Sequence, residues 1–301
     1  MKINFKAYIA WIAICIIWGT TYLAIKIGVT ELPPMLFAGL RWISAGIILI
    51  ILLNLSGKTL PRFKDLKRIA IVGISLIGIA NGLVVVAEQW ISSGLTALLL
   101  STLPFWMVAS ESIIAKGPKV NLYIAAGLIS GTIGVLILFS RDLEILVDVK
   151  LLIGVICLLV AVISWSLGSI YSKYVKVNVH PLMNASFQML IAGILQTALG
   201  FVLGEYSEFN MNMNGFLAIA YLILFGSIIG YPAYIYAIEH LPLSLVSTYA
   251  YINPIIALVL GWYILDEVLT IYVLISAVLI IVGVILVKRG SSIEMKKTRS
   301  P

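Results

Sequence analysis

Residues 81–111 read NGLVVVAEQWISSGLTALLLSTLPFWMVASE, and this stretch decides the fold. Two apolar runs meet there at a short turn, residues 92–94, and each run is long enough to cross a bilayer. The runs also contain residues that are unusual inside a membrane: Asn81, Glu88, Gln89, Pro104 and Glu111. A carboxylate at mid-membrane costs about 2.5 to 3.5 kcal/mol on insertion scales, so such groups usually face a protein interior or a watery cavity. The stretch therefore predicts a membrane hairpin that lines part of a solute pathway.

The composition of the whole chain agrees with a membrane protein. Of its 301 residues, 61% are apolar and 11% are charged, and the mean hydropathy is +1.11. A soluble domain has about 25% charged residues, so this chain could not cover a water-facing surface. The net charge of +7 does not indicate nucleic-acid binding, because the basic residues sit in short loops between apolar runs. The composition predicts an all-α membrane protein with the lipid bilayer as its partner.

Ten apolar segments have the length of a membrane-spanning helix. They lie at residues 7–28, 34–55, 69–91, 95–115, 121–140, 151–174, 182–203, 215–239, 243–265 and 269–287. Loop charges then predict the orientation, because Lys and Arg concentrate on the cytoplasmic side. With the N-terminus in the cytoplasm, the outer side receives two basic residues, Arg141 and Lys150. The inner side receives sixteen: Lys2, Lys6, Lys58, Arg62, Lys64, Lys67, Arg68, Lys116, Lys119, Lys173, Lys176, Lys288, Arg289, Lys296, Lys297 and Arg299. Both termini are therefore predicted to be cytoplasmic.

The chain also contains an internal repeat. An offset of 147 residues places Trp18 on Trp165, Lys26 on Lys173, Pro34 on Pro181 and Gly46 on Gly193. An offset of 150 places Leu95 on Leu245 and Pro104 on Pro254. We expect one five-helix unit at residues 1–145, a second at 146–290 and a cytoplasmic tail at 291–301. Because five is odd, the second unit must be inverted in the bilayer, which is a common architecture of secondary transporters.

The repeat and its motifs resemble the EamA-type ten-span permeases of the drug/metabolite transporter superfamily. In the first half the resembling motifs are IIWGTTYLAIKIG at 16–28, FAGLRWISAG at 37–46 and NGLVVVAEQWISSGLTALLLSTLP at 81–104. In the second half they are IIGYPAYIYAIEHLPLSLVSTYAYINP at 228–254 and LGWYILDEVLT at 260–270. The acidic residue of LDEVLT has no counterpart in the first half, where Lys116 and Gly117 occupy the matching place. We interpret that turn as structural.

The resemblance implies a central cavity lined by the first, third, fourth, sixth, eighth and ninth predicted spans. Polar and aromatic residues recur at helical spacing on several of these spans. They are the candidate cavity or substrate-binding residues: Trp18, Asn81, Glu88, Gln89, Ser101, Trp106, Trp165, Tyr231, Tyr234, Thr248, Tyr251 and Asn253.

Glu88 is the first candidate for function among these residues. Together with Arg41 and Lys26 it is expected near the outer end of the bundle, where the three charges could bind a zwitterion or gate entry. Alternatively, Glu88 titrates and couples a proton to transport. The simplest alternative is a structural ion pair between Glu88 and Arg41.

The remaining candidates have structural interpretations. Arg41 and Glu111 are predicted to be structural charges, and Pro104 and Pro254 are hinge candidates because each removes one helical hydrogen bond. The spacing of Gly127 and Gly131 allows close helix packing, inside the chain or in a weak homodimer. No metal or cofactor is predicted.

The sequence thus favours a non-enzymatic secondary transporter of the inner or plasma membrane. The resemblance implies export of small metabolites, amino acids or similar amphiphilic solutes, by alternating access. Multidrug efflux and lipid-carrier flipping are alternatives within transport. A non-transporting membrane scaffold or a receptor is the alternative from another class.

Overall fold

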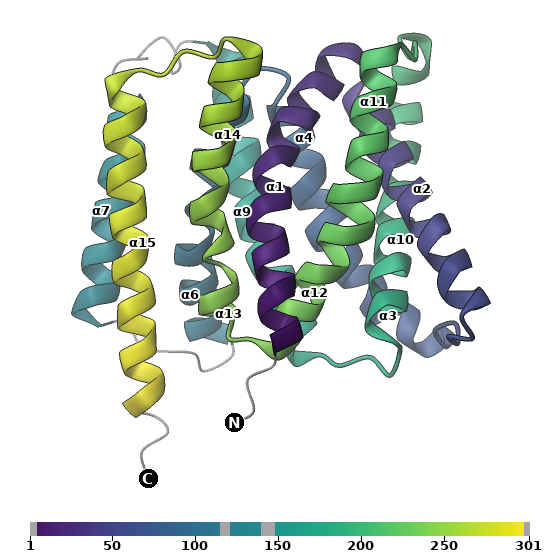
Figure 1. Cartoon of the computed structure of the whole chain (residues 1–301), viewed down its shortest axis with the longest axis horizontal. Coiled ribbons are helices and arrows are strands. Elements are labelled where there is room, and N and C mark those ends of the chain that lie inside the picture. Colours follow the sequence, from purple (N-terminus) through teal and green to yellow (C-terminus); the bar gives the residue numbers. More distant parts are fainter. Residues whose placement is uncertain (1–4, 115–120, 140–147, 298–301) are drawn as a thin grey trace.

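The computed structural model describes residues 5–114, 121–139 and 148–297, and it is a bundle of helices (Figure 1). Five basic residues used above to predict orientation, Lys2, Lys116, Lys119, Arg141 and Arg299, lie outside these ranges, as does Gly117. The helices are α1 (Phe5–Glu31), α2 (Pro34–Leu55), α3 (Phe63–Gly73), η1 (Ile74–Asn81), α4 (Gly82–Ala87), α5 (Ser93–Leu100), α6 (Leu103–Ile114), α7 (Leu122–Phe139), α9 (Val149–Tyr174), α10 (Pro181–Val202), η2 (Glu205–Ser207), α11 (Met213–Tyr221), η3 (Leu222–Gly230), α12 (Tyr231–His240), α13 (Leu243–Val246), α14 (Tyr249–Leu265) and α15 (Ile271–Lys297).

Seven helical stretches are long and apolar enough to cross a membrane. They are Phe5–Glu31, Pro34–Leu55, Phe63–Ala87, Ser93–Glu111, Val149–Tyr174, Pro181–Val202 and Met213–His240. Shorter apolar helices lie at Leu122–Gly134, Tyr249–Leu265 and Ile271–Val287. The expectation of an all-helical, multi-pass membrane protein is confirmed, whereas the number of ten crossings stays a prediction.

Two of the spans contain a π-helical segment in the middle. The stretch Phe63–Ala87 runs through η1, and Met213–His240 runs through η3. A π-turn is wider than an α-turn, so some backbone carbonyls lose their regular helical partner and become available to other groups. Such turns are frequent at functional sites. The third and eighth predicted spans therefore have the same internal irregularity.

Two further spans are interrupted. Ser101 and Thr102 separate α5 from α6, and Ser247 and Thr248 separate α13 from α14. Pro104 is the second residue of α6, directly after the first interruption, and the first turn of a helix suits a residue that has no backbone N–H. Pro254 lies inside the continuous helix α14. The two hinge candidates thus occupy different local structures.

Glycine residues bring α2 and α10 into close contact. A Cβ atom added to Gly46 would lie 2.9 Å from the backbone nitrogen of Leu190, and one added to Gly193 would lie 2.6 Å from that of Ile43. Gly193 follows Gly46 by 147 residues, and Leu190 follows Ile43 by 147 residues, so the two contacts are related by the repeat offset. Only residues without a side chain allow two helix backbones to approach so closely.

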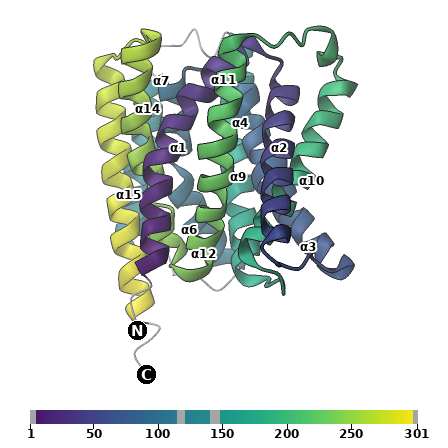
Figure 2. The same ribbon diagram turned by 45° about the vertical axis from the view of Figure 1, so that its right-hand side comes forward.

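A second close pair is formed by α7 and α15. A Cβ atom on Gly127 would lie 2.3 Å from the carbonyl oxygen of Gly283, and one on Gly283 would lie 2.5 Å from that of Gly127. Both views show α7 beside α15 at one edge of the bundle and α2 beside α10 at the other (Figures 1 and 2). Gly127 therefore packs against a helix of the same chain.

The first and last helices have a common end. The start of α1 and the end of α15 both lie at the lower end of the bundle, and α3 lies at the same end on the other side (Figure 1). The long apolar helices run between this end and the opposite one, so the two ends correspond to the two membrane surfaces.

We predict that Gly193→Ala destabilises the protein by about 1 to 3 kcal/mol, because the new methyl group collides with the backbone at Ile43. The matched control is Gly78→Ala, where the nearest atom to the added Cβ is 3.4 Å away. Thermal unfolding in detergent compares the two variants. Equal transition temperatures would contradict the close packing of α2 on α10.

Candidate functional site

A cavity of about 80 Å³ lies at the centre of the bundle. Its walls come from α1, α2, η1, α4, α5, α6, α9 and α14. The lining includes three of the residues predicted from the sequence, Trp18, Asn81 and Trp165. Most of the other lining residues are apolar, and Arg41 is the one charged side chain among the described residues that line the cavity.

Four aromatic rings form a cluster on one side of this cavity. The Trp18 ring centroid lies 5.4 Å from that of Trp165, 5.2 Å from that of Tyr234 and 5.2 Å from that of Tyr249. Tyr234 accepts a hydrogen bond of 2.9 Å from Trp165 Nε1, and its hydroxyl lies 2.5 Å from Ser169 Oγ. The repeat-related residues Trp18 and Trp165 thus face each other in an edge-to-face contact.

A second aromatic pair joins polar groups near Asn81. The Trp42 ring packs edge-on against Tyr231 at 5.7 Å, and Trp42 Nε1 donates to Asn81 Oδ1 at 2.8 Å. The Tyr231 hydroxyl donates to Gln188 Oε1 at 2.7 Å. These bonds fix the orientation of the Asn81 and Tyr231 side chains.

Arg41 is held in place by two contacts. Its Nε donates to Ser227 Oγ at 2.8 Å, and its guanidinium lies over the Trp42 ring, 4.2 Å from the centroid. The residue is 3% exposed, and Nη1 has no hydrogen-bond partner in the described part of the chain. A guanidinium is always charged in proteins and can donate five hydrogen bonds. Arg41 therefore offers an unused donor at the cavity wall.

The π-helical segments η1 and η3 expose carbonyls that side chains of other helices satisfy. Trp18 Nε1 donates to Gly226 O at 3.2 Å, and Gln196 Nε2 donates to Ile77 O at 2.9 Å. Ile77 O also accepts from the backbone N–H of Gly82, so Gln196 adds a second bond to this carbonyl. Such bonds from other helices fix the wide turns in position.

Glu88 lies at the end of α4 and has no ion pair with Arg41 in the structure. It is 0% exposed, and neither carboxylate oxygen has a hydrogen-bond partner among the described residues. Lys26 lies beside it, but its ammonium donates to the backbone carbonyls of Glu88 (2.6 Å) and Ile91 (3.2 Å). The charged groups of Glu88, Lys26 and Arg41 make no direct bonds with one another in the described part of the chain.

Lys173 makes the corresponding contacts in the second half. Its ammonium donates to the carbonyls of Ile238 (3.3 Å) and Leu241 (2.8 Å). Lys173 follows Lys26 by 147 residues, and Ile238 and Leu241 follow Glu88 and Ile91 by 150. Each lysine thus satisfies free carbonyls at the end of a helix, where a positive charge also interacts favourably with the helix dipole.

Glu267 is a residue whose contacts the sequence did not predict. It lies in the loop between α14 and α15, and its carboxylate accepts hydrogen bonds from Ser93 N (2.9 Å), Ser93 Oγ (2.8 Å) and Gly94 N (3.2 Å). These groups belong to the first turn of α5, where backbone N–H groups lack helical partners and a negative charge is favourable. The turn interpreted as structural joins the two halves of the chain.

The other predicted residues lie outside the cavity wall. Asn253, with its amide nitrogen oriented toward acceptors, donates to Cys15 O (3.0 Å) and Tyr249 O (3.1 Å). Glu111 accepts from the Tyr174 hydroxyl at 2.8 Å. Four residues have local side-chain bonds or only packing contacts: Gln89, Ser101, Thr248 and Trp106. The half-buried Tyr251 has a hydroxyl without a hydrogen-bond partner among the described residues.

The sequence did not single out Tyr22 and Trp42, although both line the cavity. Both lie in motifs quoted for the family resemblance. Trp42 directly follows Arg41, and Tyr22 is four residues after Trp18. Their helices carry apolar residues on nearly all sides, so the sequence pattern does not distinguish the cavity face from the packed faces.

The fold and the central cavity define a multi-pass helical membrane protein of the transporter class. A family model described as "EamA-like transporter family" matches the chain twice, at residues 5–140 and 152–289. The chain belongs to this family, as the resemblance of its motifs predicted.

Named relatives are also membrane transporters. The chain is 35% identical over 282 residues to the inner membrane transporter YedA of Escherichia coli K12. The aligned region covers 93% of this chain and 90% of YedA. It is 27% identical over 288 residues to the transporter YoaV of Bacillus subtilis, covering 93% and 95% of the two chains. These similarities identify the chain as a multi-pass protein of the inner membrane.

A solved structure titled "Crystal structure of protein" has the same fold. It superimposes with a TM-score of 0.70, covering 93% of this chain and 96% of that one, at 18% identity. At this identity the similarity concerns the fold alone.

We predict that Glu267→Ala destabilises the protein by about 1 to 3 kcal/mol, because three donors at the start of α5 lose a charged acceptor. The matched control is Glu208→Ala, which removes an exposed carboxylate. Thermal unfolding in detergent measures both. A control variant that unfolds as early as Glu267→Ala would contradict the role of Glu267.

Proposed function

We propose that this protein is a secondary transporter that exports small amphiphilic metabolites, with amino acids as the first class to test. The observation that carries this proposal is the central cavity, whose walls come from helices of both halves and which has Arg41 as the one charged residue among the described residues that line it. A cavity enclosed by two similar halves can open alternately to the two membrane surfaces.

The proposed topology has ten spans in two inverted units, residues 1–145 and 146–290, followed by the cytoplasmic tail at 291–301. Three observations support it. The family model matches the chain twice, the contacts of Lys26 recur at Lys173, and the helix pair α2 and α10 makes reciprocal contacts at the repeat offset. The start of α1 and the end of α15 at one end of the bundle fit two cytoplasmic termini (Figure 1).

Two features of the cavity wall support this substrate class. Arg41 Nη1 is an unused donor that fits a carboxylate, and the aromatic cluster around Trp18 fits an apolar side chain. A neutral amino acid has both groups, although it also brings an ammonium. Asn81 at the wall and Glu88 nearby are candidate partners for that ammonium.

Multidrug efflux is the second candidate function. The observation in its favour is the predominantly apolar and aromatic lining of the cavity, which suits apolar cations or neutral drugs. Such substrates would not need Arg41. The two functions therefore differ in their dependence on this residue.

Glu88 is the candidate for proton coupling. It is fully buried, its carboxylate oxygens have no hydrogen-bond partners among the described residues, and Lys26 lies beside it. Protonation would remove its charge, and deprotonation would restore a charge next to Lys26. The matching position of the second half is occupied by Ile238, so only one half carries this group.

Purified protein in liposomes should take up labelled neutral amino acids, and Arg41→Gln should lower this uptake by roughly ten- to a hundredfold, the effect of losing a charged hydrogen bond. The matched control, Arg289→Gln, removes an arginine outside the cavity and should transport normally. Uptake of no amino acid by the folded wild-type protein would contradict the proposal. Drug transport that is unaffected by Arg41→Gln would favour multidrug efflux.

Glu88→Gln should abolish the stimulation of transport by a pH gradient, because glutamine cannot exchange a proton. Exchange of labelled for unlabelled solute without a gradient should persist. The matched control is Glu239→Gln, which removes an exposed carboxylate from the end of α12. A wild-type response to the pH gradient in Glu88→Gln would exclude Glu88 as the coupling group.

A further inference from the structure

A second pocket lies at the membrane surface where α1 begins and α15 ends. It has a volume of about 300 Å³ and lies between the start of α3 and the segment that connects α9 to α10. It is lined by Arg62, Lys64, Asp65, Arg68, Lys176 and Asn178. These residues come from segments about 110 residues apart in the sequence, so the fold, rather than a single basic loop, brings them together.

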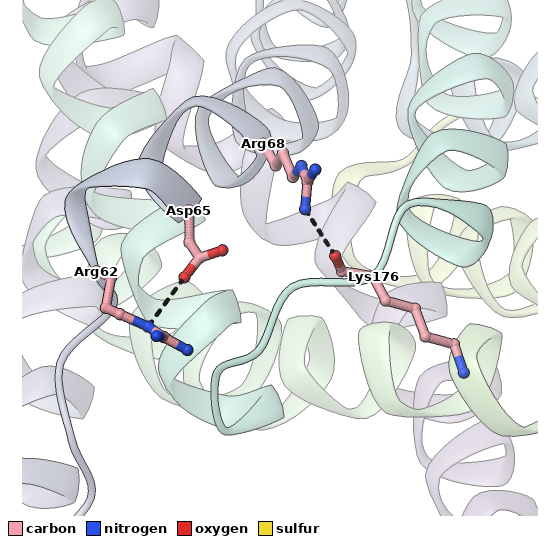
Figure 3. Close-up of polar contacts among 4 residues, drawn as sticks. All are labelled: Arg62, Asp65, Arg68 and Lys176. Atoms are coloured by element: carbon pink, nitrogen blue, oxygen red, sulfur yellow. Dashed lines mark hydrogen bonds and ion pairs between the residues drawn. The ribbon is translucent and has the colours of Figure 1, made fainter.

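Internal contacts hold the wall of this pocket in place (Figure 3). The Asp65 carboxylate is 4% exposed and lies 3.9 Å from Arg62 Nε. Arg68 Nη1 donates to the backbone carbonyl of Lys176 at 3.4 Å, which links α3 to the connecting segment. Figure 3 shows the Lys176 side chain extending away from Arg68. These contacts connect the start of α3 to the segment before α10 on one side of the pocket.

The pocket is strongly positive. Four basic side chains and one carboxylate line it, which leaves three positive charges in excess. The start of α3 adds the partial positive charge of a helix N-terminus. Lys and Arg in loops are sufficient to set membrane topology, but that role does not require a cavity. Several basic side chains around one surface pocket suit an anion with several acceptor oxygens, as in a phosphate group.

Apolar residues next to the pocket are exposed. Phe63 is 90% exposed and Leu60 is 54% exposed, and both lie within two residues of the lining residue Arg62. At the surface of a membrane, such side chains can contact acyl chains while adjacent basic residues contact headgroups. A soluble phosphate compound would make no use of them.

We propose that this pocket binds the phosphate headgroup of an anionic membrane lipid, with the acyl chains beside Phe63 and Leu60. The lipid would contact α3 of the first half and the segment before α10 of the second half. This site is separate from the central cavity, and its occupation does not depend on which solute the cavity carries.

The test is binding of phosphatidylglycerol to the full chain, purified in detergent and followed by native mass spectrometry. Phosphatidylcholine and inorganic phosphate are the comparison probes. The wild-type protein should prefer phosphatidylglycerol over both. In Lys64→Gln/Lys176→Gln, affinity for phosphatidylglycerol should fall about fivefold for each charge removed. Neither lysine side chain makes a hydrogen bond that holds the helices together in the described structure, so the fold should be preserved.

The matched control is Lys58→Gln/Lys67→Gln, which removes two exposed charges near the same end of the bundle but outside the pocket. It should bind phosphatidylglycerol nearly as the wild type does. A second variant, Arg62→Gln/Arg68→Gln, should weaken binding at least as much as the lysine pair. Equal binding by the control and pocket variants, or equal binding of phosphatidylcholine, would overturn the site. Inorganic phosphate binding as tightly as phosphatidylglycerol would overturn the assignment to lipid.

Discussion

Every backbone polar group inside a membrane needs a partner within the protein, and this constraint shapes the centre of the molecule. The wide turns of η1 and η3 leave carbonyls accessible to other groups, and side chains from other helices bond to them. Trp18 donates to Gly226 O, and Gln196 donates to Ile77 O, which also accepts from the backbone N–H of Gly82. Because a tryptophan or glutamine at these positions must reach a particular carbonyl, the bonds that satisfy the irregular backbone also position the helices around the cavity.

Both halves contain an equivalent set of helix contacts, a shared frame, but their charged residues differ. Lys26 and Lys173 make equivalent bonds to helix ends, so they belong to the shared frame. At the repeat offset of 147, Arg41 corresponds to Gln188, which hydrogen bonds Tyr231. A glutamine can satisfy its neighbours as a neutral group, whereas Arg41 retains a charge and an unused donor. Arg41 is matched by Gln188 and Glu88 by Ile238, so the two halves share their packing but differ in these two charges.

Much of the fold could be predicted from the sequence, because apolar length and helix breakers follow from local composition. The approach of Gly46 to α10 also agrees with the repeat. The site was harder to predict. Glu88 was the first candidate for function, with an ion pair to Arg41 as the structural alternative. The described residues form no such pair, and Lys26 binds backbone carbonyls. Glu267 bonds to residues 174 positions away, and no local pattern encodes such a distance. For helices that are apolar on all sides, tertiary packing likewise decides which face lines the cavity.

The packing also bears on how the cavity could open. The α2 and α10 pair and the α7 and α15 pair join the two halves through backbone contacts at glycine, at opposite edges of the bundle (Figure 2). Pulling the halves apart as rigid bodies would break both close contacts, and packed interfaces do not deform gradually. Bending at the interruptions near Thr102 and Thr248 would leave them intact. These interruptions lie in the spans that carry Pro104 and Pro254, so we expect the hairpin at residues 81–111 and its counterpart to move while the edges stay fixed.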